Sequence, residues 1–220
     1  RAKTVQPEYV IDISDIPELN FIEYDEDKGL RIGAASTLST LEKSTKPGQM
    51  YSLLAQAAGM VGSVAIRNVG TIGGNLCQDT KCLEYAQIHT YGLASCYRSG
   101  GDVCHAVRGA KRCSAMAIPD TAPSLICMDA NVRIVGPGGE RTCFLEDFFV
   151  SSGVVDLHPN EILTAIEVPH LPPNTDGIYL KHSLGDSVDF SIASVAVVLT
   201  RDDGICKDAR IGLLGVARVP

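Results

Sequence analysis

The segment GTIGGNLCQDTKC, which runs from Gly70 to Cys82, carries two different chemical signals. Its doubled glycine has no Cβ, so backbone N–H groups there can approach an anionic ligand closely and form a nest around it. Asn75 follows directly and can both donate and accept hydrogen bonds. The segment matches neither the GxGxxG fingerprint nor the Walker loop, and a lone GGN is more often a turn. Cys77 and Cys82 then suggest a metal, so this segment either serves two cofactors or is a turn followed by two buried thiols.

Composition limits the classes of protein to which the chain can belong. With 220 residues and 45% hydrophobic content, it can bury a core as one larger domain or two small ones. A net charge of −7 argues against nucleic acid as a main partner. No apolar run reaches the roughly 20 residues that a membrane-spanning helix needs, and the first residues do not form a signal peptide. Eight cysteines could pair in a secreted protein, but a core of this size needs no disulfides, so we expect reduced thiols and a cytoplasmic location.

The hydropathy pattern predicts an α+β fold with a mainly antiparallel sheet and helices. Strands predominate and helices gather in the first half of the chain. Ser36 or Thr37 is expected to cap the first helix. The segment VAIRNVGTIGGN is apolar and β-prone but interrupted by glycines. We expect helices at 37–44, 50–63 and 120–130, and strands at 10–14, 29–36, 131–144, 161–169, 177–183 and 190–216, the last broken by a hairpin at 202–204.

Between Leu76 and Ala117 the pattern has no period, although five of the eight cysteines lie there. A loop of this length is either functional or disordered. No CxxC pair occurs, which weakens the case for a zinc ribbon. Four thiolates could still bind zinc or a four-iron cluster, and His89 and His105 keep mixed zinc ligation open. From position 78 to position 113 there are five basic and three acidic residues, a balance of 5 − 3 = +2 that suits an anionic metal–thiolate site without choosing the metal.

The motifs RNVGTIGGNLC, PDTAPSLICMDANVRIV, EILTAIEVP and YLKHSLGDSVDFSIASVAVVL, in this order, resemble the FAD-binding (medium) subunit of the molybdenum hydroxylase family, which includes xanthine dehydrogenase. The resemblance implies the FAD-binding domain of the molybdenum hydroxylase flavoprotein type. Asn75 and Asp120 stand 45 positions apart here, much farther than in most members. That insertion is similar to the one in the β subunit of 4-hydroxybenzoyl-CoA reductase, which holds an extra [4Fe-4S] cluster. By position, the implied ligands are Cys82, Cys96, Cys104 and Cys113.

The resemblance also implies which residues contact the flavin. Thr71, Gly73, Gly74 and Asn75 would hold the FAD pyrophosphate, with Cys77 nearby. Asp120 would hydrogen-bond toward the flavin or its ribityl chain, Ile162 and Leu163 would pack on the isoalloxazine, and Lys181 would stabilise the reduced, anionic ring. Without a flavin, Asp120 would be a helix N-cap, Ile162 and Leu163 core strand residues, and Lys181 a solvated charge. Cys127, Cys143 and Cys206 are interpreted as small buried apolar residues.

For the domain organisation, we expect residues 1–169 to form the core of the FAD-binding domain, with an iron–sulfur insert at 78–117. Residues 170–220 would add closing strands to the same domain. The family's N-terminal glycine-loop subdomain and its C-terminal domain are expected to be absent from this chain.

The function implied by the resemblance is electron transfer, with no catalytic residue in this chain. Electrons would pass from ferredoxin through the [4Fe-4S] cluster and FAD to the molybdenum subunit, as in 4-hydroxybenzoyl-CoA reductase. The expected partners are a molybdopterin-binding large subunit, a [2Fe-2S] small subunit and an external electron partner such as ferredoxin, with no nucleic acid and no membrane. One alternative is the FAD subunit of an aldehyde or heteroarene dehydrogenase that runs in the oxidative direction. Another is a zinc-stabilised docking subunit without redox function.

Overall fold

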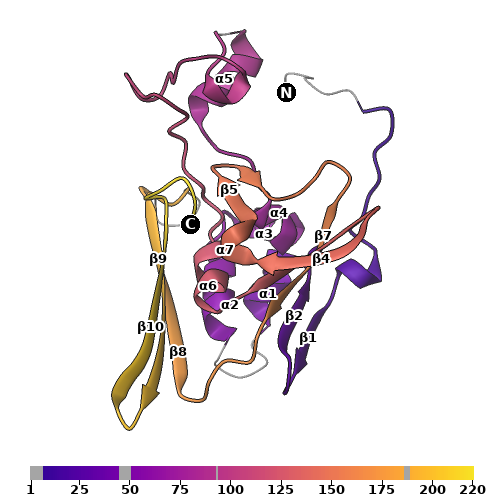
Figure 1. The fold of residues 1–220 in the computed structure, drawn as a ribbon, viewed down its shortest axis with the longest axis vertical. Coiled ribbons are helices and arrows are strands. Elements are labelled where there is room, and N and C mark those ends of the chain that lie inside the picture. The colour runs from indigo at the N-terminus through magenta and orange to yellow at the C-terminus, as the bar shows by residue number, and fades with distance from the viewer. Residues whose placement is uncertain (1–6, 45–50, 93, 186–188) are drawn as a thin grey trace.

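The computed structural model describes residues 7–44, 51–92, 94–185 and 189–220, except for the side chains of residues 89–91 (Figure 1). In chain order the elements are η1 (Pro17–Leu19), β1 (Ile22–Asp25), β2 (Gly29–Gly33), α1 (Leu38–Lys43), α2 (Ser52–Gly59), α3 (Val64–Val69), α4 (Ile72–Leu76), α5 (Leu83–Tyr91), η3 (Tyr97–Ser99), α6 (Ala122–Cys127), β3 (Asn131–Gly136), β4 (Gly139–Phe144), α7 (Leu145–Phe148), β5 (Phe149–Ser151), β6 (Val154–Val155), β7 (Ile162–Val168), β8 (Thr175–His182), β9 (Ala193–Asp202) and β10 (Ile205–Leu214). Strands and helices fall largely in separate runs along the chain, with α1 to α6 together and most strands after them, as the predicted α+β class requires, so the fold class is confirmed.

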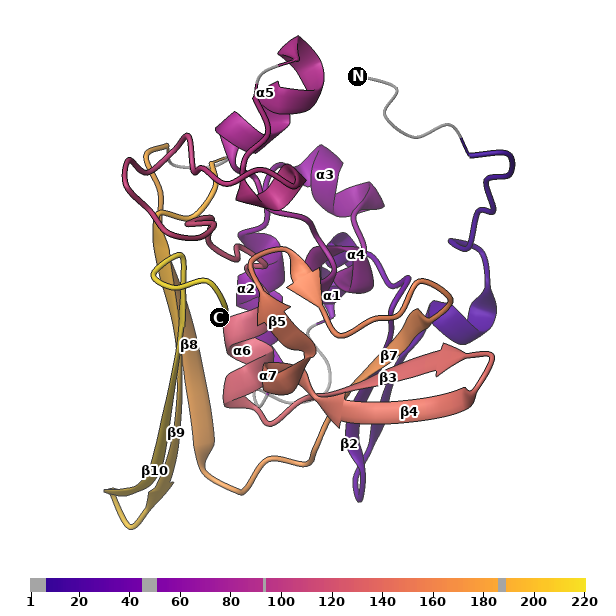
Figure 2. The same cartoon turned by 45° about the horizontal axis from the view of Figure 1, so that its top comes forward.

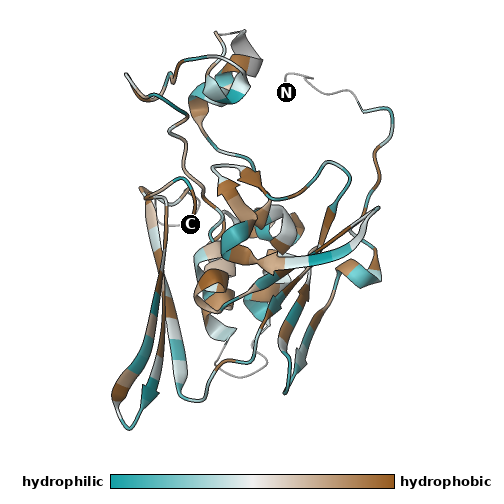
Figure 3. Cartoon of the chain, viewed as in Figure 1, coloured by the Kyte–Doolittle hydropathy of each residue, from teal (hydrophilic) through white to brown (hydrophobic). Residues whose placement is uncertain are grey.

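Two antiparallel sheets enclose a layer of helices. The larger sheet has the order β1-β2-β7-β3-β4, and the smaller has the order β10-β9-β8. Figure 1 shows the helices α1, α2 and α6 between the sheets, where α2 packs on β8 and α6 on β9 and β10. In Figure 3, the inner parts of this helical layer carry many hydrophobic residues, coloured brown. Their burial supplies the main driving force for bringing the two sheets together.

Local signals explain several of these elements. Thr37 caps α1, its side chain accepting a hydrogen bond from the backbone N–H of Thr40. Pro123 stands in the first turn of α6, where its missing N–H costs nothing. The β9–β10 hairpin turns through Asp203 and Gly204, which adopt φ angles of 48° and 77°. Left-handed backbone of this kind favours Asp and Gly in tight hairpin turns.

Two predictions for local structure were wrong, and a segment described as β-prone is helical. Residues 10–14 form no strand, and Val10 and Ile11 are 85% and 82% exposed, so their β-propensity finds no partner strand. The β-prone stretch after Ser63 forms two short helices, α3 and α4, because Ser63 and Thr71 each accept a capping hydrogen bond from the backbone three residues on. Cys206, expected to be buried, is exposed on β10.

The cysteine-rich segment, residues 78–117, is called the cysteine insert below. It contains α5 and η3 and extends away from the two sheets (Figures 1 and 2). No helix in the described ranges is long and apolar enough to cross a membrane. The smaller sheet, to which most of residues 170–220 belong, is separate from the larger one.

Candidate functional site

The glycine segment is anchored on the connection between β2 and α1 by backbone hydrogen bonds. The Leu38 N–H donates to the Gly70 carbonyl at 2.9 Å, and the Ile72 N–H donates to Ser36 at 3.0 Å. The Gly73 N–H donates to the carbonyl of Ala34 at 2.9 Å. These bonds place the start of α4 at the end of the larger sheet.

The two glycines of this segment have different roles. A Cβ on Gly73 would lie 2.8 Å from the carbonyl oxygen of Ala34. The close packing of the glycine segment against the β2–α1 connection therefore requires glycine there. A Cβ on Gly74 would meet only the hydroxyl of Thr71, at 3.0 Å. That hydroxyl accepts the N–H of Gly74 at 3.0 Å. Gly73 therefore serves packing, whereas Gly74 keeps an open face bare of side chain.

The open face of Gly74 belongs to a cavity of about 470 Å³. Its polar wall is formed by Thr71, Gly74, Asn75, Gln78, Lys81, Asp120, Lys181 and Asp189. Its apolar wall includes Leu38, Val61, Ile66, Val69 and Phe190. A concave site with an apolar surface and a few convergent polar groups is the usual form of a small-molecule or cofactor site.

Asn75 connects the glycine segment to the segment before α6. It is buried, and its Oδ1 accepts hydrogen bonds from the hydroxyl of Thr121 at 2.7 Å and from the backbone N–H of Thr121 at 3.3 Å. Asn75 thus ties the glycine segment to Thr121, next to Asp120 in the polar wall. Because its oxygen is used in this way, its side chain can offer only donors to a ligand.

A buried ion pair forms another part of the polar wall. Lys181 Nζ lies 3.2 Å from Asp120 Oδ2 and donates to the carbonyl of Met60 at 2.9 Å. The hydroxyl of Tyr179 donates to Asp120 Oδ1 at 2.9 Å. The side chains of Lys181 and Asp120 are only 6% and 8% exposed, so neither is a solvated charge. Asp120 is also not the N-cap of α6, a position taken by Thr121.

Burial raises the pKa of Asp120, while the charge of Lys181 and the hydrogen bonds from Tyr179 and Lys181 lower it and only partly offset that effect. Burial, followed by the charge of Asp120, raises the pKa of Tyr179, which therefore stays a hydrogen-bond donor. The arrangement places the cation of Lys181 at the cavity wall and holds it with two oxygen partners, Asp120 Oδ2 and the carbonyl of Met60.

Comparison with known proteins identifies the family. Residues 1–171 match the family model described as the FAD binding domain in molybdopterin dehydrogenase. The chain belongs to this family.

Relatives of this FAD-binding domain are subunits of oxidoreductases. The chain is 28% identical to the carbon monoxide dehydrogenase medium chain of Afipia carboxidovorans, over 100% of this chain and 63% of that protein. It is 29% identical to the aldehyde oxidoreductase FAD-binding subunit of Escherichia coli, over 97% and 70%. The structure superposes on carbon monoxide dehydrogenase from Hydrogenophaga pseudoflava with a TM-score of 0.74 and 27% identity, covering 99% of this chain and 62% of that one. The chain thus spans less than two thirds of the carbon monoxide dehydrogenase chains.

The residues of the cavity suit FAD. A side chain at Gly74 would enter the space that the glycine leaves open. The N–H groups of residues 72–75 already donate within the protein, so the groups that can donate to an anionic pyrophosphate are the hydroxyl of Thr71 and the side-chain amide of Asn75. The apolar wall suits a planar ring, and the cation of Lys181 suits negative charge on it.

The structure brings together some of the predicted flavin contacts. Thr71, Gly74, Asn75, Asp120 and Lys181 line the cavity. Gly73 lies behind the wall, and Cys77 packs against the hydrophobic core, where burial raises the pKa of its thiol to about 11. Leu163 belongs to the core, whereas Ile162 is 49% exposed at the start of β7, and neither lines the cavity.

Sequence reasoning missed Tyr179 and the apolar wall. Ile66 and Val69 stand three residues apart on α3 and are 51% and 78% exposed. Aliphatic residues at this spacing after a capping serine are a signal for a helix with one apolar face. Tyr179 carried no signal, because its partner Asp120 is 59 residues away.

The four predicted metal ligands do not form a ligand group. Across the ranges that the structure describes, no three His, Cys, Asp or Glu side chains are arranged to hold a metal ion. Cys96 is buried and Cys82, Cys104 and Cys113 are half-buried, all as free thiols. His89 lies among the side chains outside the description, and His105 Nε2 is 2.8 Å from the carbonyl of Ala94.

Two of these thiols have environments that favour the thiolate. For Cys96, burial is the largest influence and raises the pKa, but the hydroxyl of Ser99 and nearby backbone N–H groups together lower it below its usual value. For Cys104, burial again raises the pKa, and hydrogen bonds from the backbone N–H groups of Val107 and Ser114 outweigh it. Thiolate is the form that binds metals and reacts as a nucleophile.

Proposed function

We propose that this chain is the FAD-binding, electron-transfer subunit of a molybdenum-containing oxidoreductase. The observation that carries the proposal is the cavity, which joins the open face of Gly74 to the buried pair of Asp120 and Lys181 within a domain of the FAD-binding family. When bound, FAD supplies the exchange between two-electron and one-electron steps.

The residues of the chain would bind and orient this cofactor. The space beside Gly74 would accommodate the pyrophosphate, and the hydroxyl of Thr71 and the side-chain amide of Asn75 would donate to it. Lys181 would hold its positive charge beside the ring, because Asp120 and the Met60 carbonyl fix the position of its ammonium group. A fixed cation favours the more negative, reduced state of a nearby group.

The proposed assembly follows the relatives. Carbon monoxide dehydrogenase medium chain, xanthine dehydrogenase FAD-binding subunit and aldehyde oxidoreductase FAD-binding subunit are the names of matched proteins. We therefore place this chain beside a molybdopterin-binding large subunit and a [2Fe-2S] small subunit. The eight free thiols support a reducing, cytoplasmic location.

For the type of complex, we propose 4-hydroxybenzoyl-CoA reductase, with ferredoxin as the donor and a [4Fe-4S] cluster at Cys82, Cys96, Cys104 and Cys113. The lowered thiol pKa values of Cys96 and Cys104 and the cationic balance of the insert support a metal there. The present arrangement of the four thiols does not fit a cluster, so cluster binding requires the insert to rearrange. We assign no electron-transfer step to it.

The oxidative direction is a second candidate function. The E. coli aldehyde oxidoreductase FAD-binding subunit aligns over 97% of this chain, and its match supports an aldehyde dehydrogenase as readily as a reductase. A zinc-stabilised docking subunit is the third candidate, and the thiol-rich insert is the feature that supports it.

The experiment is metal analysis and an absorption spectrum of protein purified without oxygen. A flavin band is expected in the parent protein and its loss in Gly74→Asp, because the carboxylate would crowd the cavity and repel the phosphates. Gly138→Asp is the matched control, because a Cβ at Gly138 would meet nothing within 4 Å. Flavin retained by Gly74→Asp would refute the site. Zinc without flavin or iron in the parent would favour the docking subunit.

A further inference from the structure

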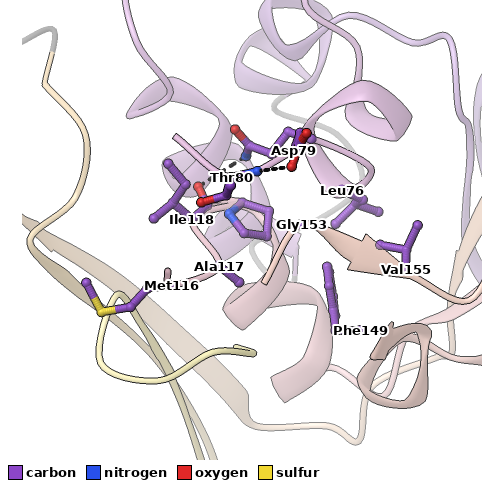
Figure 4. A pocket seen from close by; sticks show the side chains of 11 residues that line it. Leu76, Asp79, Thr80, Met116, Ala117, Ile118, Phe149, Gly153 and Val155 are labelled. Carbon is purple, nitrogen blue, oxygen red and sulfur yellow. Dashed lines mark hydrogen bonds between the residues drawn. The ribbon is translucent and has the colours of Figure 1, made fainter. Parts of the chain in front are cut away.

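The cysteine insert joins the rest of the domain through two adjacent segments, residues 78–80 and 117–118, which form its neck. The side-chain amide of Gln78 donates to the carbonyl of Ile118 at 3.1 Å and so ties the outgoing segment to the returning one. Figure 4 shows Asp79 and Thr80 of the outgoing segment beside Ala117 and Ile118 of the returning one, around a small cavity of about 10 Å³. Gly153, in the turn between β5 and β6, also lines this cavity.

Arg98, from the middle of the insert, reaches back to this turn. Its Nη1 donates to the carbonyl of Ser152 at 2.7 Å, and its Nη2 donates to the carbonyl of Gly153 at 2.8 Å. Nη2 also pairs with the carboxylate of Asp79 in the neck. The guanidinium carbon lies 5.5 Å from the ring centre of Tyr85 on α5, and the side chain is only 16% exposed. One cation therefore joins the insert, the neck and the β5–β6 turn.

The turn is shaped to receive Arg98. Gly153 has a φ angle of +63°. A Cβ there would lie 2.6 Å from Asp79 Oδ1, 2.6 Å from the N of Thr80 and 2.9 Å from Arg98 Nη2. Real Cβ atoms do not approach backbone atoms or a fixed ion pair this closely. The contact of the β5–β6 turn with Arg98 and the neck therefore requires glycine at position 153. Arg98 and Gly153, which lie 55 positions apart in the sequence, thus meet in one close contact.

We infer that Arg98 is a positioning residue that clamps the cysteine insert onto the β5–β6 turn. The planar guanidinium offers several donors in a rigid fork, and here the fork spans two carbonyls and a carboxylate. A lysine at this position would carry the charge but could not span these acceptors with the same geometry. The clamp holds η3, and with it Cys96, in one position relative to the two sheets.

The clamp also reaches the candidate flavin cavity, a consequence that rests on the proposed function. Ile118 lines both the neck cavity and the flavin cavity, and so does Gln78. Their positions depend on the neck, which Arg98 holds through Asp79. Loss of the clamp therefore loosens one wall of the flavin cavity, although Arg98 itself does not line it.

The first test measures the position of the insert without using flavin, metal or activity. Spin labels are introduced as non-canonical amino acids at the exposed positions Lys111, in the insert, and Glu146, on α7. Pulsed electron paramagnetic resonance then gives the distribution of distances between them. We expect one narrow distribution in the parent and a distribution at least about twofold broader in Arg98→Gln and Gly153→Ala, because the local opening of an undocked segment costs little free energy.

The control variant is Arg108→Gln, which removes an exposed arginine from the same insert and is expected to keep the narrow distribution. Arg98→Lys is expected to fall between the parent and Arg98→Gln. Far-UV circular dichroism of each variant confirms that the sheets remain folded. A broad distribution in the parent, or an unchanged one in both Arg98→Gln and Gly153→Ala, overturns the inference.

The second test measures FAD release. We expect FAD to dissociate at least about threefold faster from Arg98→Gln than from the parent, with Arg108→Gln unchanged. An equal rate in the parent and Arg98→Gln overturns the link to the cavity. A parent that binds no FAD overturns the proposed function instead, and the distance measurement still decides whether the clamp exists.

Discussion

Removing the cation at the cavity wall should destabilise the protein in a way that depends on pH. Lys181→Met keeps much of the length of the side chain but, among the residues that the structure describes, leaves the buried carboxylate of Asp120 with only the hydroxyl of Tyr179 as a partner. Breaking a buried ion pair by removing one partner costs about 3–5 kcal/mol. Because the pair borders an open cavity that water can enter, we expect the lower end, about 3 kcal/mol at neutral pH.

The sign of the pH dependence follows from the pKa of Asp120. Burial already raises this pKa above 3.8 in the folded protein, and loss of the lysine charge raises it further. The folded variant then binds a proton more tightly than the unfolded chain. The stability that this proton contributes to the variant is fully present below the unfolded pKa of 3.8. It is lost as the pH rises through the raised pKa of Asp120 in the folded variant. The deficit relative to the parent is therefore largest at neutral pH and shrinks as the pH falls through the raised folded pKa of Asp120.

The assay is urea unfolding of four proteins: the parent, Lys181→Met, Asp120→Asn and the double variant. Each single variant leaves one buried charged partner unpaired, whereas the double variant leaves no unpaired charge. The double variant should therefore lose clearly less free energy of unfolding than the sum of the two single variants. A deficit below about 1 kcal/mol for Lys181→Met at neutral pH would refute the reasoning, since solvent-exposed pairs contribute no more than that. A deficit that does not change between neutral and acidic pH would refute the assignment to Asp120.

Two further predictions concern the glycine segment and the insert. Gly73→Ala should lower the free energy of urea unfolding by about 1–3 kcal/mol, because its Cβ would lie 2.8 Å from the carbonyl of Ala34, while Gly138→Ala should change it little. If the insert binds a cluster, Cys104→Ser should lower the iron content of anaerobically purified protein, whereas Cys127→Ser, buried beneath β9, should retain it; equal loss from both would contradict the ligand assignment.

Some features of the fold could be read from short stretches of sequence. Thr37 caps α1, and the Asp-Gly turn at 203–204 closes the β9–β10 hairpin. These signals act between residues a few positions apart, so they can be recognised without knowing the structure of the rest of the chain. The order of the longer motifs likewise identified the family, which the family model confirms over residues 1–171.

Other local predictions failed because several conformations were open to the same residues. The apolar, β-branched residues of α3 suit a strand as well as a helix, and the cap at Ser63 decided the outcome. Val10 and Ile11 have strand-forming side chains but no neighbouring strand to pair with. Propensity is therefore a weak guide where a partner element has to supply the hydrogen bonds.

By itself, the sequence determined the class of fold, the family and the chemistry available: a glycine pair, a lysine, an aspartate and a set of thiols. Only the tertiary structure decided which of these groups meet. It paired Lys181 with Asp120 across 61 positions, added Tyr179, placed Cys77 and Leu163 in the core, and kept the four insert thiols out of a common ligand group. The physical reason is that pairing buried charges, filling a core and docking an insert through Arg98 depend on distances between segments remote in sequence, which no local pattern of residues specifies.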